Sequence, residues 1–321
     1  MKRAKKIWLI TAASLLMLGC VIFVAVMTML NWDFTKLSTS NYETNTHKIS
    51  EAFRDISVET NTADITFVPT ENAECFVECF EQENLKHSVT VNNGKLMIRV
   101  DDTRKWYHFI SLGFDSPKIT VYLPRGKYDA LSVESDTGDV EIPSDFSFTS
   151  IDISEDTGDV KSFASVSGAV RIHTSTGRIR LADITVGSME LKTSTGNVIA
   201  SDIICAGDIS VTVSTGETHL SAVTCQNLTT KGSTGALTLE QVVANGNFNI
   251  ERSTGDVTFV GSDAAEIFVY TDTGDVEGIL LTDKVFIVNS DTGEIDVPNS
   301  ITGGRCEITT DTGDIKIKIH N

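Results

Sequence analysis

The chain has 321 residues, with 26 Lys and Arg against 44 Asp and Glu, so its formal net charge is −18. Five prolines against 23 glycines exclude a collagen-like or proline-rich architecture, and 40% hydrophobic residues exclude wholesale disorder. The first 36 residues carry a net charge of +4, which leaves about −22 on the remainder. An acidic body of this kind repels phosphate backbones and disfavours nucleic-acid binding.

The N-terminal segment predicts a membrane anchor. A basic flank over residues 1–6 precedes an uncharged run over residues 7–30, and these 24 residues form a helix long enough to cross a hydrocarbon core of about 30 Å. The basic flank places the N-terminus inside and the body outside the cell membrane. A cleaved signal peptide is the first alternative. A lipoprotein with Cys20 as the lipidated residue is the second, although the apolar run after Cys20 argues against cleavage there.

The residues between this helix and the repeats divide into two parts. Residues 31–50 are polar and predict a tether, and residues 51–130 predict an N-terminal β region that covers the end of the repeat array. Strands are expected near residues 74–80, 88–91, 95–100 and 118–123, with a turn at Asn93-Gly94.

An aromatic stretch, RKWYHFISLGF, lies within this β region at residues 104–114. One interpretation is a loop folded over the open end of the core, since the ends of repeat arrays need covering. The other is a contact patch for the membrane or a partner, formed by Trp106, Tyr107 and Phe109.

From residue 131 to the end, one pattern recurs around a glycine every 19–20 residues. The marking glycines are Gly138, Gly158, Gly177, Gly196, Gly216, Gly235, Gly255, Gly274, Gly293 and Gly313. A degenerate copy at residues 56–67 has Ala63 in place of the glycine. Apolar residues lie seven and five places before nearly every glycine and mostly two places after it, with largely polar residues between them. This alternation is typical of half-buried strands.

These repeats over residues 131–321 predict a β-solenoid of about ten coils, because one short repeat cannot enclose a core alone. A meander of hairpins, each turning at the glycine, is the alternative. The Thr before each glycine matches the inward parity, which predicts a stacked Thr ladder inside. The last strand, IKIKIHN, is expected to be a free sheet edge guarded by Lys316 and Lys318.

The series FRDISVETNTADITFVP, VNNGKLMIRV and KITVYLPRGKYDALSVESDTGDVEI, followed by the further copies, resembles the bacterial putative-adhesin family of β-strand-repeat domains. The resemblance covers about residues 53–321. It implies a surface protein, often membrane-tethered and from Gram-positive bacteria, with an all-β fold. It implies no defined activity, because the family has none established.

The acidic turns suggest a calcium hypothesis, since carboxylates on neighbouring coils repel and Ca²⁺ relieves that repulsion. The residues concerned are Asp136, Asp139, Asp156, Asp159, Asp272, Asp275, Asp311 and Asp314. Solvated turn carboxylates without metal are the alternative and the one we favour. We therefore expect no metal and no cofactor.

Enzyme chemistry finds no support in the sequence. Asp-Thr-Gly resembles the aspartic-protease triplet, but Ser-Thr-Gly fills the same place in five other copies, which indicates a structural turn. The six histidines are scattered, and no phosphate-cradling motif is present. Five cysteines outside the apolar run do not make a disulfide framework. Cys205 and Cys225 could come within bridging reach, although buried free thiols are expected.

The sequence thus predicts a cell-surface binding, adhesion or scaffolding module, with a surface protein or a glycan as the ligand. An accessory or sensory subunit of an envelope-stress system is the alternative. A polysaccharide-active β-helix enzyme is a further one.

Overall fold

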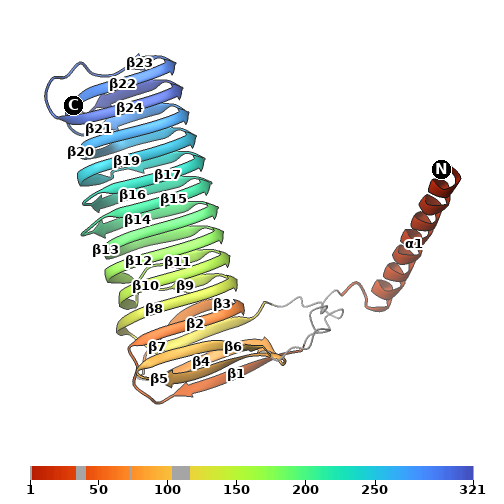
Figure 1. Cartoon of the computed structure of the whole chain (residues 1–321). Coiled ribbons are helices and arrows are strands. Elements are labelled where there is room, and N and C mark those ends of the chain that lie inside the picture. Colours follow the sequence, from red (N-terminus) through yellow and green to blue (C-terminus); the bar gives the residue numbers. More distant parts are fainter. Residues whose placement is uncertain (1, 34–40, 73, 103–115, 321) are drawn as a thin grey trace.

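The computed structural model describes residues 2–33, 41–72, 74–102 and 116–320. It is mostly β, with a β-solenoid of about ten turns and one long apolar helix at the N-terminus (Figure 1). The predicted fold class is therefore confirmed, and the hairpin meander is wrong, because equivalent strands of successive repeats pair in parallel.

The helix α1(Lys2–Met29) contains the predicted apolar run. Its polar side chains do not interrupt the helix, because the hydroxyls of Thr11, Ser14 and Thr28 donate hydrogen bonds to carbonyls four residues earlier. The segment Lys5–Met29 is long and apolar enough to span a membrane, and no other helix in the described part of the chain passes that test. It ends where Asn31 and Trp32 adopt positive φ angles of 54° and 58°.

The strands before the repeats are β1(Tyr42–Ile49), β2(Asp55–Thr62), β3(Asp64–Thr70), β4(Cys75–Gln82), β5(Leu85–Asn92), β6(Lys95–Asp102) and β7(Lys118–Pro124). The strands of the repeats are β8(Gly126–Thr137), β9(Val140–Ile142), β10(Phe146–Thr157), β11(Val160–Ser162), β12(Ser165–Thr176), β13(Ile179–Thr195), β14(Val198–Cys205), β15(Ile209–Thr215), β16(Thr218–Cys225), β17(Leu228–Thr234), β18(Leu237–Glu240), β19(Val243–Thr254), β20(Val257–Thr273), β21(Val276–Leu280), β22(Lys284–Thr292), β23(Ile295–Asp296), β24(Gly304–Thr312) and β25(Ile315–Ile319).

Equivalent residues of neighbouring coils face each other along the rod. Leu131 pairs with Ile151, Ile151 pairs with Val170, and these side chains are buried in one continuous core. The degenerate copy belongs to the same stack, because Thr62 of β2 pairs with Thr137 of β8. Eleven coils at a strand spacing of about 4.8 Å give a rod of about 50 Å.

The turns at the marking glycines are too close for a side chain. A Cβ on Gly196 would lie 1.9 Å from the carbonyl oxygen of Gly177, and Gly196 has a φ of 143°. The Thr before each glycine stacks in register but is exposed, so the expected inward Thr ladder is wrong. The inward positions stop three residues before the glycine, because the turn exposes the next two residues together.

The N-terminal end of the rod is covered by antiparallel strands. β6 pairs in parallel with β2, while β5 pairs antiparallel with β6, and β4 pairs antiparallel with both β7 and β1. The four expected strands and the Asn93-Gly94 turn are confirmed, with positive φ at both turn residues. The expected tether is shorter than residues 31–50, because residues 42–49 form β1. Tyr42 of this strand stacks on Phe80, with ring centroids 5.2 Å apart.

The last two coils are exchanged in space. Gly313 stacks on Gly274, and Gly293 stacks on Gly313, so the C-terminal coil lies between two earlier coils of the chain. The outermost coil is therefore β22 and β23, and the expected free edge at the last strand is wrong: β25 pairs with β21 on one side and with β23 on the other. Lys316 instead pairs with Asp314 at 2.6 Å and Glu294 at 3.6 Å.

Candidate functional site

Two aromatic side chains point outward from one strand of the rod. Strand alternation buries Ile267, Val269 and Thr271 of β20, so Phe268 and Tyr270 face outward between them. Tyr270 is 46% exposed. The equivalent outward positions of the other coils are polar or charged, apart from Ile287 on the outermost coil.

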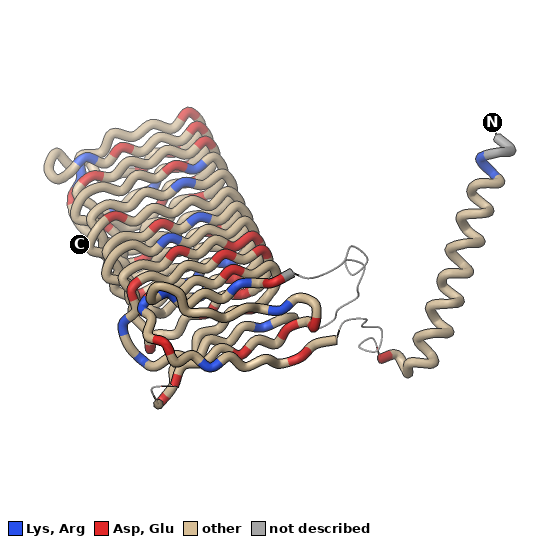
Figure 2. Tube along the Cα trace, turned by 60° about the horizontal axis from the view of Figure 1, so that its bottom comes forward, with Lys and Arg blue, Asp and Glu red and all other residues tan. Residues whose placement is uncertain are grey.

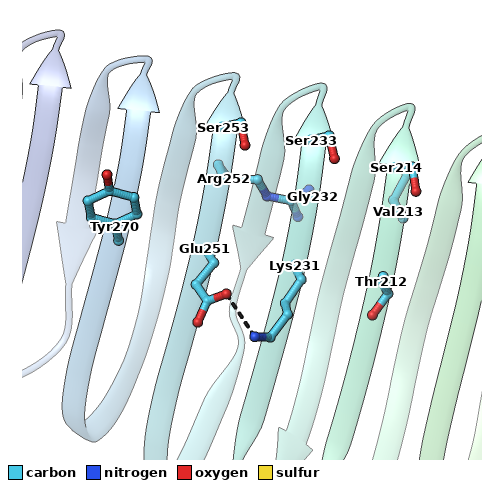
Figure 3. Close-up of a pocket in the computed structure, with 10 residues that line it drawn as sticks. All are labelled: Thr212, Val213, Ser214, Lys231, Gly232, Ser233, Glu251, Arg252, Ser253 and Tyr270. Atoms are coloured by element: carbon cyan, nitrogen blue, oxygen red, sulfur yellow. Dashed lines mark hydrogen bonds and ion pairs between the residues drawn. The ribbon is translucent and has the colours of Figure 1, made fainter.

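Two shallow grooves flank Tyr270, and we call them the Tyr270 grooves. The first has a volume of about 430 Å³ and is lined by residues that include Thr212, Ser214, Lys231, Glu251 and Tyr270 (Figure 3). The second has a volume of about 270 Å³ and is lined by residues that include Asn249, Glu251, Phe268, Tyr270, Glu307 and Thr309. The Tyr270 ring therefore stands between two concave surfaces that are rich in hydroxyl, amide and carboxylate groups.

Ion pairs hold the charged side chains of the Tyr270 grooves. Lys231 Nζ lies 2.7 Å from Glu251 Oε2, and both side chains are more than half exposed, so the pair adds little stability. Arg305 pairs with Glu307 and lies over the Phe268 ring, 5.5 Å from its centroid. A hydrogen bond to Asp272, assisted by the charges of Asp272 and Asp311, raises the pKa of Tyr270.

A buried guanidinium lies beneath the first groove. Arg252 is 2% exposed, and its side chain extends from β19 toward Gly232 of β17, where no side chain occupies the space (Figure 3). A Cβ on Gly232 would lie 1.8 Å from Arg252 Nη1. None of the three guanidinium nitrogens has a hydrogen-bond partner, and burial lowers the pKa of Arg252 to about 10.

The residues of the calcium hypothesis lie along the turn edge of the rod, where Figure 2 shows acidic residues. The carboxylates that follow the glycines are engaged in hydrogen bonds: Asp139 Oδ1 accepts from the backbone N–H of Asp159, and Asp159 Oδ1 accepts from that of Arg178. Asp275 Oδ1 likewise accepts from the backbone N–H of Asp314. These hydrogen bonds link several pairs of neighbouring coils, and the calcium hypothesis stays a prediction.

Another cluster, which sequence reasoning missed, joins Cys79, Glu81 and His87 in the N-terminal strands. Among the described residues, it is the only group of at least three Cys, His, Asp or Glu side chains whose donor atoms lie within 4.8 Å of one another. Its polar atoms already have partners. His87 Nδ1 lies 2.7 Å from Glu81 Oε2, and Asn45 Nδ2 donates to Glu81 Oε1 at 2.8 Å.

The chemistry of this cluster is that of a structural network. Burial, with the charges of Glu81 and Glu78, raises the pKa of Cys79 to about 12, so the thiolate that zinc requires is disfavoured. Thr60 Oγ1 lies 2.9 Å from His87 Nε2, which gives the order hydroxyl, imidazole and carboxylate of a hydrolase triad. All three side chains are buried, so no substrate reaches the hydroxyl.

A cavity of about 710 Å³ lies beside the coil exchange. Lys284 Nζ lies 2.6 Å from Asp263 Oδ1 and donates to Thr282 Oγ1 at 2.6 Å, and the Lys284 and Asp263 side chains are almost fully buried. Because the three groups satisfy one another, we assign them to holding the start of β22 in place.

Two other predictions from the sequence concern the aromatic contact patch and a pair of cysteines. The expected contact patch, Trp106, Tyr107 and Phe109, lies outside the described residues and stays a prediction. Cys205 and Cys225 are both buried and free of disulfide. Burial raises the pKa of Cys225 to about 12, so its thiol is unreactive.

Comparison with known proteins identifies the family. The model of the family described as Toastrack DUF4097 matches residues 53–207 and 185–321. The chain belongs to this family. The resemblance seen in the sequence is thereby confirmed. No curated protein matches the chain.

The solved structures that match this toastrack protein share little sequence with it. A putative adhesin from Parabacteroides distasonis is 12% identical, with a TM-score of 0.48. The match covers 75% of this chain and 98% of the adhesin chain. A putative adhesin from Bacteroides fragilis is 13% identical, with a TM-score of 0.43, covering 87% and 97%. A putative cell adhesion protein from Clostridium sporogenes is 9% identical, with a TM-score of 0.31, covering 87% and 100%. None of these three is described as an enzyme.

Proposed function

We propose that this toastrack protein is a membrane-anchored cell-surface module that binds a ligand and acts in adhesion. The observation that carries the proposal is the order of its parts: an exposed apolar helix comes first, followed by a rod whose outer face carries the Tyr270 grooves. Apolar side chains of α1 such as Trp8 and Leu16 are more than 70% exposed, and a bilayer would cover them.

The basic flank of α1 supports an orientation with the rod outside the cell. The matching structures from Parabacteroides, Bacteroides and Clostridium are a putative adhesin, a putative adhesin and a putative cell adhesion protein, which supports a role in attachment. A scaffold at the envelope or an accessory subunit of a stress response would need the same membrane anchor. Only a measurement of adhesion therefore distinguishes the adhesive role from these alternatives.

Two measurements on the full chain test the proposal. Proteinase K added to intact cells should degrade an epitope placed after the rod, while a cytoplasmic marker survives. Cells that express the chain should adhere to cell-wall or glycan-coated surfaces more than cells that express α1 alone. An epitope protected from the protease would overturn the orientation, and equal adhesion would overturn the adhesive role.

A further inference from the structure

We propose that the Tyr270 grooves bind an uncharged polysaccharide, with one sugar ring stacked on Tyr270. This inference rests on the proposed surface function and names the ligand class of the module.

Tyr270 supplies an exposed aromatic surface on a flat sheet. Its neighbours in the same outward column are Glu251 of β19 and Thr309 of β24, on the paired strands to either side. Neighbouring strands lie about 4.8 Å apart, which is about the width of a pyranose ring. The apolar C–H face of a sugar packs on an aromatic face, and the tyrosine ring loses little conformational entropy when it does so.

The polar groups beside the ring match the hydroxyls of a sugar. Asn249 offers an amide, Thr309 a hydroxyl, and Glu251 and Glu307 offer carboxylate acceptors on opposite sides of Tyr270. Lys231 pairs with Glu251, and Arg305 pairs with Glu307, so each carboxylate acceptor has a cationic donor beside it. A sugar hydroxyl, which both donates and accepts, fits such a pair.

The charge of the molecule selects an uncharged ligand. The chain carries a net charge of −18, and Asp272 and Asp311 lie beside the grooves on the turn edge. Lys231 in the first groove and Arg305 beside the second are paired with glutamates, and the unpaired Arg252 is only 2% exposed beneath the first groove, so a ligand on the surface meets little of its charge. Uronate polymers and phosphate-linked wall polymers are therefore repelled, whereas a neutral glycan meets only hydrogen-bonding groups and the ring.

Titration calorimetry on the full chain in nanodiscs tests the inference. The probes are N-acetylglucosamine hexamer, laminarihexaose and, as the anionic comparison, polygalacturonate oligomers. We expect at least one neutral probe to bind, and Tyr270→Ser to weaken that binding about tenfold or more. Tyr270→Phe keeps the ring and should bind within about threefold of the natural chain. The matched control is Ile204→Ser, at an apolar position that is 61% exposed on another strand, and it should leave binding unchanged.

Each other outcome overturns the site. A folded chain that binds neither neutral probe, or that binds polygalacturonate more tightly, refutes the ligand class. Equal losses in Tyr270→Ser and Ile204→Ser, or no loss in Tyr270→Ser, refute the location. Cells that carry Tyr270→Ser and still adhere like the natural strain would leave the adhesive function standing while refuting this site.

Discussion

Replacing Arg252 by Met should stabilise the protein. In the folded chain this guanidinium lies in the core beside Gly232, without a hydrogen-bond partner for any of its nitrogens. Methionine keeps much of the length of arginine, fills irregular space readily and carries no charge. The substitution therefore removes an unpaired buried cation while leaving the Gly232 space largely filled.

The size of the effect follows from the pKa of Arg252, which burial lowers from 12.5 to about 10. At about 1.4 kcal/mol for each pKa unit, the charged form is disfavoured by about 3 kcal/mol in the folded state. Replacing buried charges by apolar side chains of similar volume has stabilised other proteins by about 1–4 kcal/mol. We expect a gain of about 1–3 kcal/mol and a rise in Tm of several degrees.

Urea unfolding followed by circular dichroism measures the change. The matched control is Arg180→Met at an exposed position of β13, which should change the unfolding free energy by less than about 0.5 kcal/mol. A loss of stability in Arg252→Met, with the control unaffected, would refute the reasoning. It would show that the guanidinium is hydrogen-bonded in solution, by internal water for example.

Three further predictions concern the rod. Burial raises the pKa of Glu155 to about 8, so the folded state holds this proton more tightly than the unfolded state. Stability should then fall by about 3–5 kcal/mol from pH 4.5 to pH 8, and Glu155→Gln should flatten that slope in urea titrations. Gly196→Ala should lose at least about 2 kcal/mol, because the new Cβ meets a carbonyl at positive φ, whereas Gly126→Ala, with open space around it, should change little. Lys284→Met should lose about 3 kcal/mol or more by leaving Asp263 buried and unpaired, and adding Asp263→Leu should restore most of it.

Each of these three has a clear contrary result. An unchanged pH slope in Glu155→Gln would mean that another group titrates. Equal Tm values for the two glycine variants would mean that the turns tolerate a side chain. A double variant no more stable than Lys284→Met would mean that the ion pair is not the source of the loss.

Much of the fold could be predicted because the glycine period and the two-residue alternation are both local signals. The inward columns at Leu131 and Val133 followed directly from them. The outward orientation of the turn threonines could not be predicted. The two residues before each glycine both face away from the core, which breaks the alternation of the strand. The coil exchange could not be predicted, because the glycine spacings of 19 and 20 residues in the last two repeats are the same as in repeats that stack in chain order.

The candidate site was only partly visible in the sequence. Phe268 and Tyr270 occupy outward positions, and two aromatics there were a usable signal, since almost every other coil has polar residues at those places. The Glu81–His87 network required knowledge of the tight β4–β5 hairpin, which brings residues six positions apart into hydrogen-bonding distance. Arg252 could be placed only by seeing that it fills the space left by Gly232.

The exchange of the last two coils has a consequence for how the protein is made. A solenoid that grows by simple winding can add each coil in chain order, but here the sixteen-residue segment from β24 to β25 must enter between two coils that precede it in the chain. A polypeptide that stops before residue 304 thus leaves the coil formed by β22 and β23 without the strands β24 and β25 with which it pairs. The outermost coil therefore gains its pairing partner only after residues 304–319 have entered the stack, so this step closes the rod at that end.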